Sequence, residues 1–204
     1  MIELGLFPLP LVLLPTERVA LHIFEERYRE LIGECLDSGG EFGLVYADGD
    51  GLRDVGTRAR VTEVLARLPD GRMDILVEGG DRFRLLELTT GRSFQTGRVA
   101  PVEDDDDPAG RATVERALGL FDRLRELTGS DVDVPEEGAS QLSFVLAGRV
   151  EFSPGDKLEL LNDVSERSRM TRVCDLLENA LETAQRVRGA AERAATNGRV
   201  HLES

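Results

Sequence analysis

The chain has 204 residues, 41% of them apolar, and its 39 acidic against 25 basic side chains give a net charge of −14. This length and apolar content exclude a disordered chain and predict a large buried core. The negative charge disfavours nucleic acid as a partner, because the arginines are scattered among carboxylates and form no basic stripe.

The opening residues are apolar, but Pro8, Pro10 and Pro15 interrupt them. A secretory signal needs a basic start and an unbroken apolar run, and a membrane-spanning helix needs about 20 apolar residues. Neither pattern is present, so we expect a cytoplasmic protein without a membrane partner. Because proline donates no backbone hydrogen bond, residues 7–15 are predicted to lie at a sheet edge or as an extended cover.

Residues 1–103 alternate between apolar and polar side chains, which is the pattern of half-buried strands. Asp70-Gly71 is a strong hairpin signal, because both residue types tolerate a positive φ angle. We predict strands over residues 19–23, 41–47, 57–68, 73–80, 82–90 and 94–103. Short strands joined by tight turns favour a curved sheet or a small barrel.

One helix is predicted to be inserted into this sheet, directly after the strand at residues 19–23. Apolar residues recur there at spacings of three and four, which lays them on one buried helical face. These residues are Phe24, Tyr28, Leu31, Ile32 and Cys35. Gly39 follows and is predicted to end the helix with a left-handed cap.

The acidic run EDDDDP at residues 103–108 divides the chain, and helical periodicity follows it. Asp107 and Pro108 are predicted to be the N-cap and the first turn of a helix, where the missing N–H of proline costs nothing. Further helices are predicted over residues 141–150 and 153–162, the second capped by Ser153, and a long last helix begins near Ser165.

The predicted fold class is therefore α+β. A β-rich subdomain is expected at residues 1–103, and a helical subdomain with a long last helix at residues 104–195. Residues 196–204 are expected to be a flexible tail, because they are polar and terminal.

Few residues offer catalytic chemistry. A phosphate-binding loop requires a lysine after a glycine-rich turn, but the only lysine, Lys157, is predicted to be exposed in the first turn of a helix. His201 lies in the predicted tail, which leaves His22 as the candidate base. His22 alternates with Leu21 and Ile23, so we predict a surface or hydrogen-bonded histidine. We expect no catalytic residue and no enzyme activity.

No metal or cofactor site is expected either. Cys35 and Cys174 lie far apart on apolar helical positions and are predicted to be small buried residues, with no disulfide or zinc site. Adjacent carboxylates point apart and do not converge on a cation, so residues 103–107 are interpreted as a solvated linker and helix cap. Contact with a basic partner surface is the alternative interpretation of this run.

Three segments carry a family resemblance: LGLFPLPLVLLPTERVALHIFEERYRELIGECL at residues 4–36, VEGGDRFRLLEL at 77–88 and DKLELLNDVSERSRMTRVCDLLENAL at 156–181. With EFGLVYA and DVGTRARVTEVLARLPDGR between them, they resemble in order the N-terminal domain of Lon proteases, over about residues 1–190. Thr16 departs from the glycine that this family commonly has after the proline.

The resemblance implies a PUA-like pseudo-β-barrel with one inserted helix, followed by a helical bundle. It also implies a part in substrate recognition, in a free-standing form without the ATPase and Ser-Lys protease that lie downstream in full-length Lon. A peptidase function would therefore be the wrong conclusion from the family name.

The first functional hypothesis is a non-catalytic module that binds polypeptide segments or unfolded proteins. Strand addition and a hydrophobic groove are the two expected modes of binding. The candidate contacts are Phe7, Leu9, Leu11, Phe24 and Tyr28. A full-length Lon protease is a further candidate partner, and the oligomeric state is left open.

Two alternatives belong to other classes of function. Some PUA-like domains bind RNA, although the charge of this chain argues against it. A barrel pocket around His22 would instead favour a small-molecule sensor or an enzyme.

Overall fold

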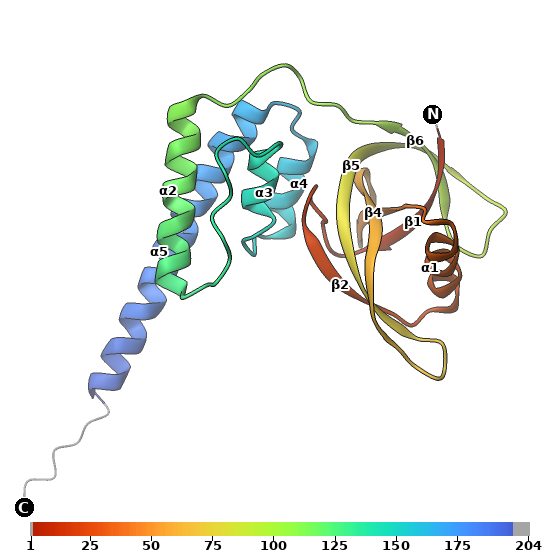
Figure 1. The fold of residues 1–204 in the computed structure, drawn as a ribbon, viewed down its shortest axis with the longest axis horizontal. Coiled ribbons are helices and arrows are strands. Elements are labelled where there is room, and N and C mark those ends of the chain that lie inside the picture. The colour runs from red at the N-terminus through yellow and green to blue at the C-terminus, as the bar shows by residue number, and fades with distance from the viewer. Residues whose placement is uncertain (1, 198–204) are drawn as a thin grey trace, which may run out of the picture.

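A computed structural model describes residues 2–197, and it divides into a strand-rich half and a helical half (Figure 1). The strand-rich half contains the elements β1 (Ile2–Leu9), β2 (Arg18–Ile23), α1 (Glu26–Ser38), β3 (Phe42–Asp48), β4 (Gly51–Arg67), β5 (Met73–Thr89) and β6 (Thr96–Pro101). The helical half contains α2 (Arg111–Thr128), α3 (Leu142–Ala147), α4 (Pro154–Asn162) and α5 (Glu166–Asn197).

The strands close into a barrel, as the spacing of short strands predicts. The sheet order is β2-β5-β4-β3-β1-β6, and an additional pairing of β5 with β6 closes the ring. β5 is one continuous strand where the sequence predicts two. Gly79 lies inside this strand and is not a break, because its missing side chain lets the backbone of Leu14 approach β5 closely. A Cβ atom at Gly79 would lie 2.2 Å from the carbonyl oxygen of Leu14. The predicted α+β class, with one inserted helix and a long last helix, is confirmed.

β1 connects two strands of the ring, and it pairs with each of them along one half of its length. Ile2–Gly5 pair with β6 and Leu6–Leu9 pair with β3, so that each half of the strand has one partner strand. Pro8 is tolerated because its part of β1 is paired on one side alone. Residues 7–9 thus have a strand partner on one side alone, and the residues that follow leave the sheet, so the prediction of an edge or an extended cover for residues 7–15 is confirmed.

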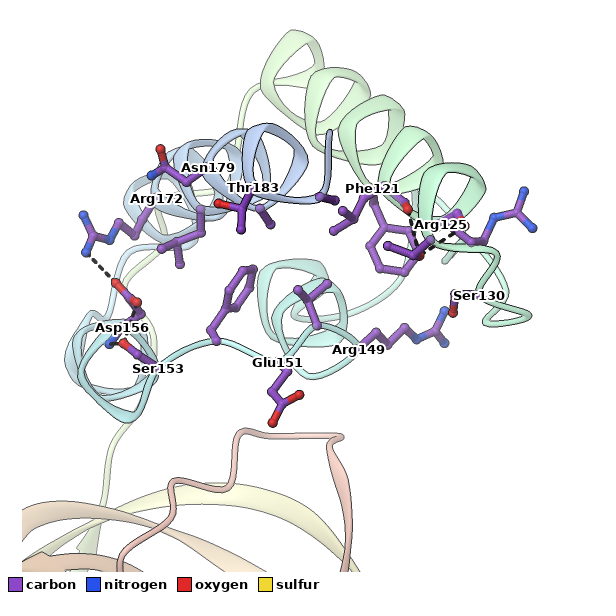
Figure 2. Close-up of a pocket in the computed structure, with 17 residues that line it drawn as sticks. Phe121, Arg125, Ser130, Arg149, Glu151, Ser153, Asp156, Arg172, Asn179 and Thr183 are labelled. Carbon is purple, nitrogen blue, oxygen red and sulfur yellow. Dashed lines mark hydrogen bonds and ion pairs between the residues drawn. The ribbon is translucent and has the colours of Figure 1, made fainter. Parts of the chain in front are cut away.

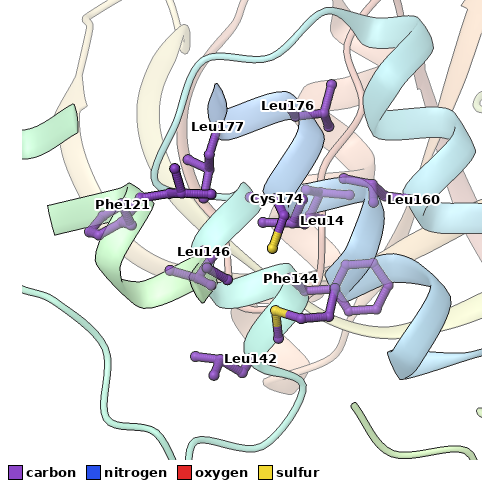
Figure 3. Packing of buried hydrophobic residues seen from close by; sticks show 14 of the residues in the cluster. Leu14, Phe121, Leu142, Phe144, Leu146, Leu160, Cys174, Leu176 and Leu177 are labelled. Atoms are coloured by element: carbon purple, nitrogen blue, oxygen red, sulfur yellow. The ribbon is translucent and has the colours of Figure 1, made fainter. Parts of the chain in front are cut away.

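Residues 12–14 connect two hydrophobic cores. Leu13 packs in the core between the barrel and α1, while Val12 and Leu14 point into the core of the helical half. Figure 3 shows Leu14 among the buried side chains of the helices. Successive side chains of this extended segment point in opposite directions, so the segment supplies apolar side chains to both halves.

α1 is positioned by the face that the sequence predicts, with one exception. Tyr28, Leu31, Ile32 and Cys35 are buried, and Gly39 caps the helix with φ 66°. Phe24 was expected on the same face, but it precedes the helix and is 60% exposed. The reason is that Glu25 is still extended, with φ −71° and ψ 137°, so the strand alternation continues through Phe24.

The predicted N-cap at Asp107 is also wrong. α2 begins at Arg111, with Gly110 at its N-cap position. Asp107 instead accepts hydrogen bonds from Ser165 Oγ at 2.6 Å and Arg167 Nε at 2.7 Å, which lower the pKa of its carboxyl group. The acidic run therefore binds the start of α5.

The other predicted helix signals hold. Ser153 caps α4 by accepting a hydrogen bond from the N–H of Asp156, and α5 begins next to Ser165. α5 includes residues 196 and 197 of the predicted tail. The rest of that tail, with His201, lies outside the described residues.

Two buried arginines join the halves. Arg82 of β5 and Arg169 of α5 both bind the carboxylate of Asp104 in the linker, and Arg169 Nη1 lies 2.7 Å from its Oδ1. Both guanidinium groups also donate to the carbonyl of Asp163, at 2.7 and 2.8 Å. Burial lowers the pKa of Arg82, while hydrogen bonds and attraction from Asp104 and Glu166 outweigh burial and raise that of Arg169.

A second buried ion pair lies between Lys157 of α4 and Glu17, which follows the 12–14 segment. Glu17 Oε2 also accepts a hydrogen bond from the backbone N–H of Leu14 at 2.9 Å. The prediction that Lys157 is exposed is wrong, because the barrel covers the first turn of α4. The charged partner comes from a residue 140 positions earlier, which helical periodicity does not reveal.

Thr16 has an unusual backbone conformation for a β-branched residue. Its φ is 66°, and it follows Pro15 in a turn closed by a hydrogen bond from Glu17 N to Leu14 O at 3.1 Å. Proline followed by a residue with positive φ is the arrangement of a type II turn, in which glycine is favoured at the third position. Left-handed φ at a residue with a Cβ atom costs roughly 1–3 kcal/mol.

Replacing Thr16→Gly should therefore raise the free energy of unfolding by about 1 kcal/mol, after the greater entropy of glycine in the unfolded chain is subtracted. Thermal denaturation should show a midpoint roughly 2–4 °C higher. Thr16→Ala keeps the Cβ atom and should bring no gain. A glycine variant no more stable than the parent would contradict the strain at this turn.

Replacing Arg169→Met should destabilise the protein by roughly 3 kcal/mol, because Asp104 and Glu166 lose a buried partner. Urea denaturation measures the change. Arg167→Met, two residues earlier on the same helix and paired with Asp107 at an exposed position, is the matched control and should stay close to the parent. Equal losses in the two variants would argue against a special role for the buried pair.

Candidate functional site

A groove of about 840 Å³ lies in the helical half between α2, α5 and the segment that joins α3 to α4 (Figure 2). Its floor is apolar, because the helices turn part of their core-facing stripe toward it. The apolar lining includes Phe121, Leu124, Val150, Phe152 and Leu176. The groove therefore presents apolar surface from three separate elements of the chain.

The rim of the groove is polar, and most of its charges are already paired. Arg172 binds Asp156 at 3.0 Å and Glu159 at 2.7 Å. Arg125 binds Asp122 at 2.7 Å, and this hydrogen bond raises the pKa of the guanidinium group. Arg149 donates to the backbone carbonyl of Asp133. Because most charged side chains of the rim already have partners, a bound molecule would make its main contacts with the apolar floor.

Two further hollows lie next to the groove. One, of about 440 Å³, is lined by Leu11 and Val19 of the strand-rich half and by Phe152. The other, of about 740 Å³, is lined by Arg18 of β2 and by Val132. Arg149 lines all three, so the hollows surround one short segment between α3 and α4.

The structure does not bring the five candidate contacts together. Phe7 and Tyr28 are buried and stacked, with ring centroids 4.1 Å apart. Leu9 is half-buried against the barrel core, and Leu11 lines the second hollow. Phe24 is exposed beside His22, at the other end of β2. Whether any of them contacts a polypeptide stays a prediction.

Sequence reasoning missed the groove because its residues carry no separate signal. Phe121, Leu124 and Leu176 belong to apolar stripes that predict ordinary helix packing. The groove exists because α2 and α5 diverge from the segment that contains Phe152, which is a property of tertiary packing.

His22 has a sufficient structural role at the surface. Its Nδ1 lies 2.6 Å from Oδ1 of Asp74 on the neighbouring strand, and both side chains are nearly half exposed. Its ring lies 5.9 Å from that of Phe24. His22 does not line the groove or either of the two adjoining hollows.

Across residues 2–197, no three His, Cys, Asp or Glu side chains are grouped as cation ligands. In the same range, no helix is long and apolar enough to cross a membrane.

Both cysteines are buried, as predicted, and both are free thiols. Burial, with a smaller contribution from Glu34, raises the pKa of the Cys35 thiol to about 11. Burial also raises the pKa of Cys174. Neither cysteine therefore has the exposed thiolate that a nucleophile requires.

Comparison with known proteins points to one family. A family model described as the ATP-dependent protease La (LON) substrate-binding domain matches residues 3–179. Lon protease 1 of Hydrogenovibrio crunogenus is 25% identical over 158 residues, which cover 71% of this chain and 19% of that protein. Lon protease of Paraburkholderia phytofirmans is 27% identical over 165 residues, covering 74% and 20%. The chain spans about a fifth of the length of these relatives.

Solved structures show the same architecture. A Lon N-terminal domain protein from Xanthomonas campestris matches with a TM-score of 0.66 at 27% identity, covering 85% of this chain and 97% of that one. The N-terminal domain of a Lon protease from the Mycobacterium avium complex matches with a TM-score of 0.64, covering 86% and 98%. At 15% identity, the second likeness concerns the fold alone.

The thiols provide a test of the site chemistry. Because the Cys35 pKa is about 11, on the order of 0.1% of its thiol is ionised at pH 8. The folded protein should therefore react with a thiol reagent such as Ellman's reagent far more slowly than the protein in urea. Absorbance at 412 nm measures the rate, and a folded protein that reacts as fast as the unfolded one would contradict the burial of both cysteines.

Proposed function

We propose a function from the premise that this chain belongs to the family of ATP-dependent protease La (LON) substrate-binding domains. It is a substrate-recognition module by family. We infer further that it binds unfolded polypeptide segments, without catalysing a reaction on them, and that the groove between α2 and α5 is the place where their apolar side chains bind.

The observation that carries this proposal is the apolar floor of the groove. A volume of about 840 Å³ lies in the usual range for ligand sites and can hold several apolar side chains. Unfolded proteins expose such side chains, whereas folded proteins bury them. Removing them from water contributes about 25 cal/mol per Å² of apolar surface, without requiring a particular sequence. Such a groove therefore distinguishes unfolded from folded chains.

The electrostatics favour polypeptide over nucleic acid. The net charge of −14 repels phosphates, and Arg125 and Arg172 at the groove are paired with carboxylates. RNA binding would need unpaired cations along one face. We therefore propose no nucleic-acid partner. A full-length Lon protease remains the proposed downstream partner, as the acceptor of the bound segments.

Thr183 on α5 faces the groove and offers a test, with Thr171 on the same helix as its control. Thr183→Glu places a charge beside the apolar floor, and it should weaken binding of an unfolded protein roughly tenfold, or about 1.4 kcal/mol. Thr171 is also exposed and does not line the groove, so Thr171→Glu adds the same charge without the local effect.

The probe is lysozyme that is reduced and alkylated with iodoacetamide, which keeps it unfolded. Fluorescence anisotropy of labelled probe gives the dissociation constants. Parent protein that fails to bind the probe would refute the proposed function. Binding that Thr183→Glu and Thr171→Glu weaken equally would move the site away from the groove.

A further inference from the structure

β2 has one open edge. It stands at the end of the sheet order and pairs with β5 alone, over Arg18–Ile23 against Met73–Glu78. Each of the other five strands pairs with at least two neighbouring strands. An open edge carries unpaired backbone N–H and C=O groups, and these are a template for a further strand.

The hydrogen bonds beside β2 show which residues face this edge. Gly79 donates its N–H to Glu17 O at 2.9 Å and accepts from Thr16 N at 2.7 Å, so the backbone of Gly79 is turned toward β2. In an antiparallel pair, hydrogen-bonded and non-hydrogen-bonded residues alternate. Continuing this alternation from Glu17 directs the backbone groups of alternate residues to the open edge. These residues are Arg18, Ala20 and His22.

A side-chain hydrogen bond on the other side of β5 agrees with this assignment. Leu76 is the partner of Ala20 in the β2–β5 register. The carbonyl of Leu76 accepts a hydrogen bond from Thr62 Oγ1 of β4 at 3.2 Å, so its backbone is turned away from β2. Ala20 therefore has no backbone partner on β5, and its N–H and C=O groups point to the open edge.

The side chains do not shield this edge. Edge strands are commonly protected by charged side chains or bulges. Here Arg18 Nε is held at 2.7 Å from Glu78, and His22 Nδ1 at 2.6 Å from Asp74, both on β5. The two polar side chains are thus drawn across the sheet and away from the edge. Between them lies Ala20, whose small side chain is exposed.

Apolar side chains stand at both ends of the edge. Phe24 follows β2 and is 60% exposed. At the other end, Val132 is 38% exposed and lines the hollow of about 740 Å³ together with Arg18. Arg149 joins this hollow to the groove between α2 and α5. Open backbone groups are therefore flanked by apolar surface, and the groove lies beyond one end.

We propose that β2 binds an extended segment of an unfolded protein as an added strand. The inference rests on the proposed function and specifies the conformation in which a segment is held. Backbone hydrogen bonds to Arg18, Ala20 and His22 supply affinity that depends little on sequence. Apolar side chains of the segment pack against Phe24 at one end and Val132 at the other.

Charge favours such a segment over a second copy of this chain. Two copies would each bring a net charge of −14. An antiparallel pair of β2 strands centred on Ala20 would also place Arg18 opposite His22 of the other copy, which offers no opposite-charge pair. The occupant is therefore a segment of neutral or basic net charge.

Ala20→Pro removes the outward N–H group and leaves every hydrogen bond from β2 to β5 in place. Binding of the reduced and alkylated lysozyme, which is basic, should weaken at least fivefold. Ala20→Thr keeps the N–H group and should bind like the parent. Circular dichroism and thermal denaturation check that both variants are folded.

Amide exchange of the parent protein, followed by NMR, gives a second readout that does not depend on the variants. The N–H groups of Arg18, Ala20 and His22 should exchange at least tenfold more slowly when the probe is bound. Unchanged exchange, or full binding by folded Ala20→Pro, would overturn strand addition. If Thr183→Glu still weakens binding in that case, the groove stands without the strand. A dimer of the parent that Ala20→Pro dissolves would show that a second copy occupies the edge, and this would also overturn the proposal.

Discussion

The arrangement of the two halves depends on one buried interaction, the binding of Asp104 by Arg82 and Arg169. Guanidinium groups taken out of water require compensation for each lost hydrogen bond, and here a carboxylate and backbone carbonyls provide it. Arg82 comes from β5, Asp104 from the linker and Arg169 from α5. The hydrogen bonds that replace the lost water therefore all form only when the barrel and the helical half pack as they do in this structure. The ring of Phe144, 4.4 Å from the guanidinium carbon of Arg169, places α3 against the same group.

This constraint explains where the candidate binding surfaces lie. With α3 and the end of α4 held at the arginines, the segment between them is left facing the barrel on one side and the groove on the other. The ion pair between Glu17, directly before β2, and Lys157 in the first turn of α4 holds the end of this segment next to the barrel. The hollow lined by Arg18 and Arg149 thus lies between the open edge of β2 and the groove.

Much of the fold is present in local sequence patterns. Strand alternation predicts the barrel, and spacings of three and four predict the buried face of α1 from Tyr28 onward, together with its glycine cap. The failures concern residues whose partners are distant in sequence. Phe24 fits a helical stripe as well as a strand alternation, and the extended Glu25 decides between them. Asp107 is of a residue type common at helix caps, and Lys157 is of a type common at the surface. Tertiary packing instead gives each of them a partner elsewhere in the chain. The groove is less predictable still, because it arises where helices diverge and not from any motif.

Polypeptide binding is proposed on a surface that runs from the groove to β2. Hydrogen–deuterium exchange measured by mass spectrometry, with and without reduced and alkylated lysozyme, is the decisive experiment for this surface. Exchange should slow in β2 and in the segment between α3 and α4 when the unfolded protein is present, with no change in β3, which lies three strands away from β2 in the sheet order. Exchange that the unfolded protein leaves unchanged throughout the chain, or slows only outside these segments, would contradict the proposed surface.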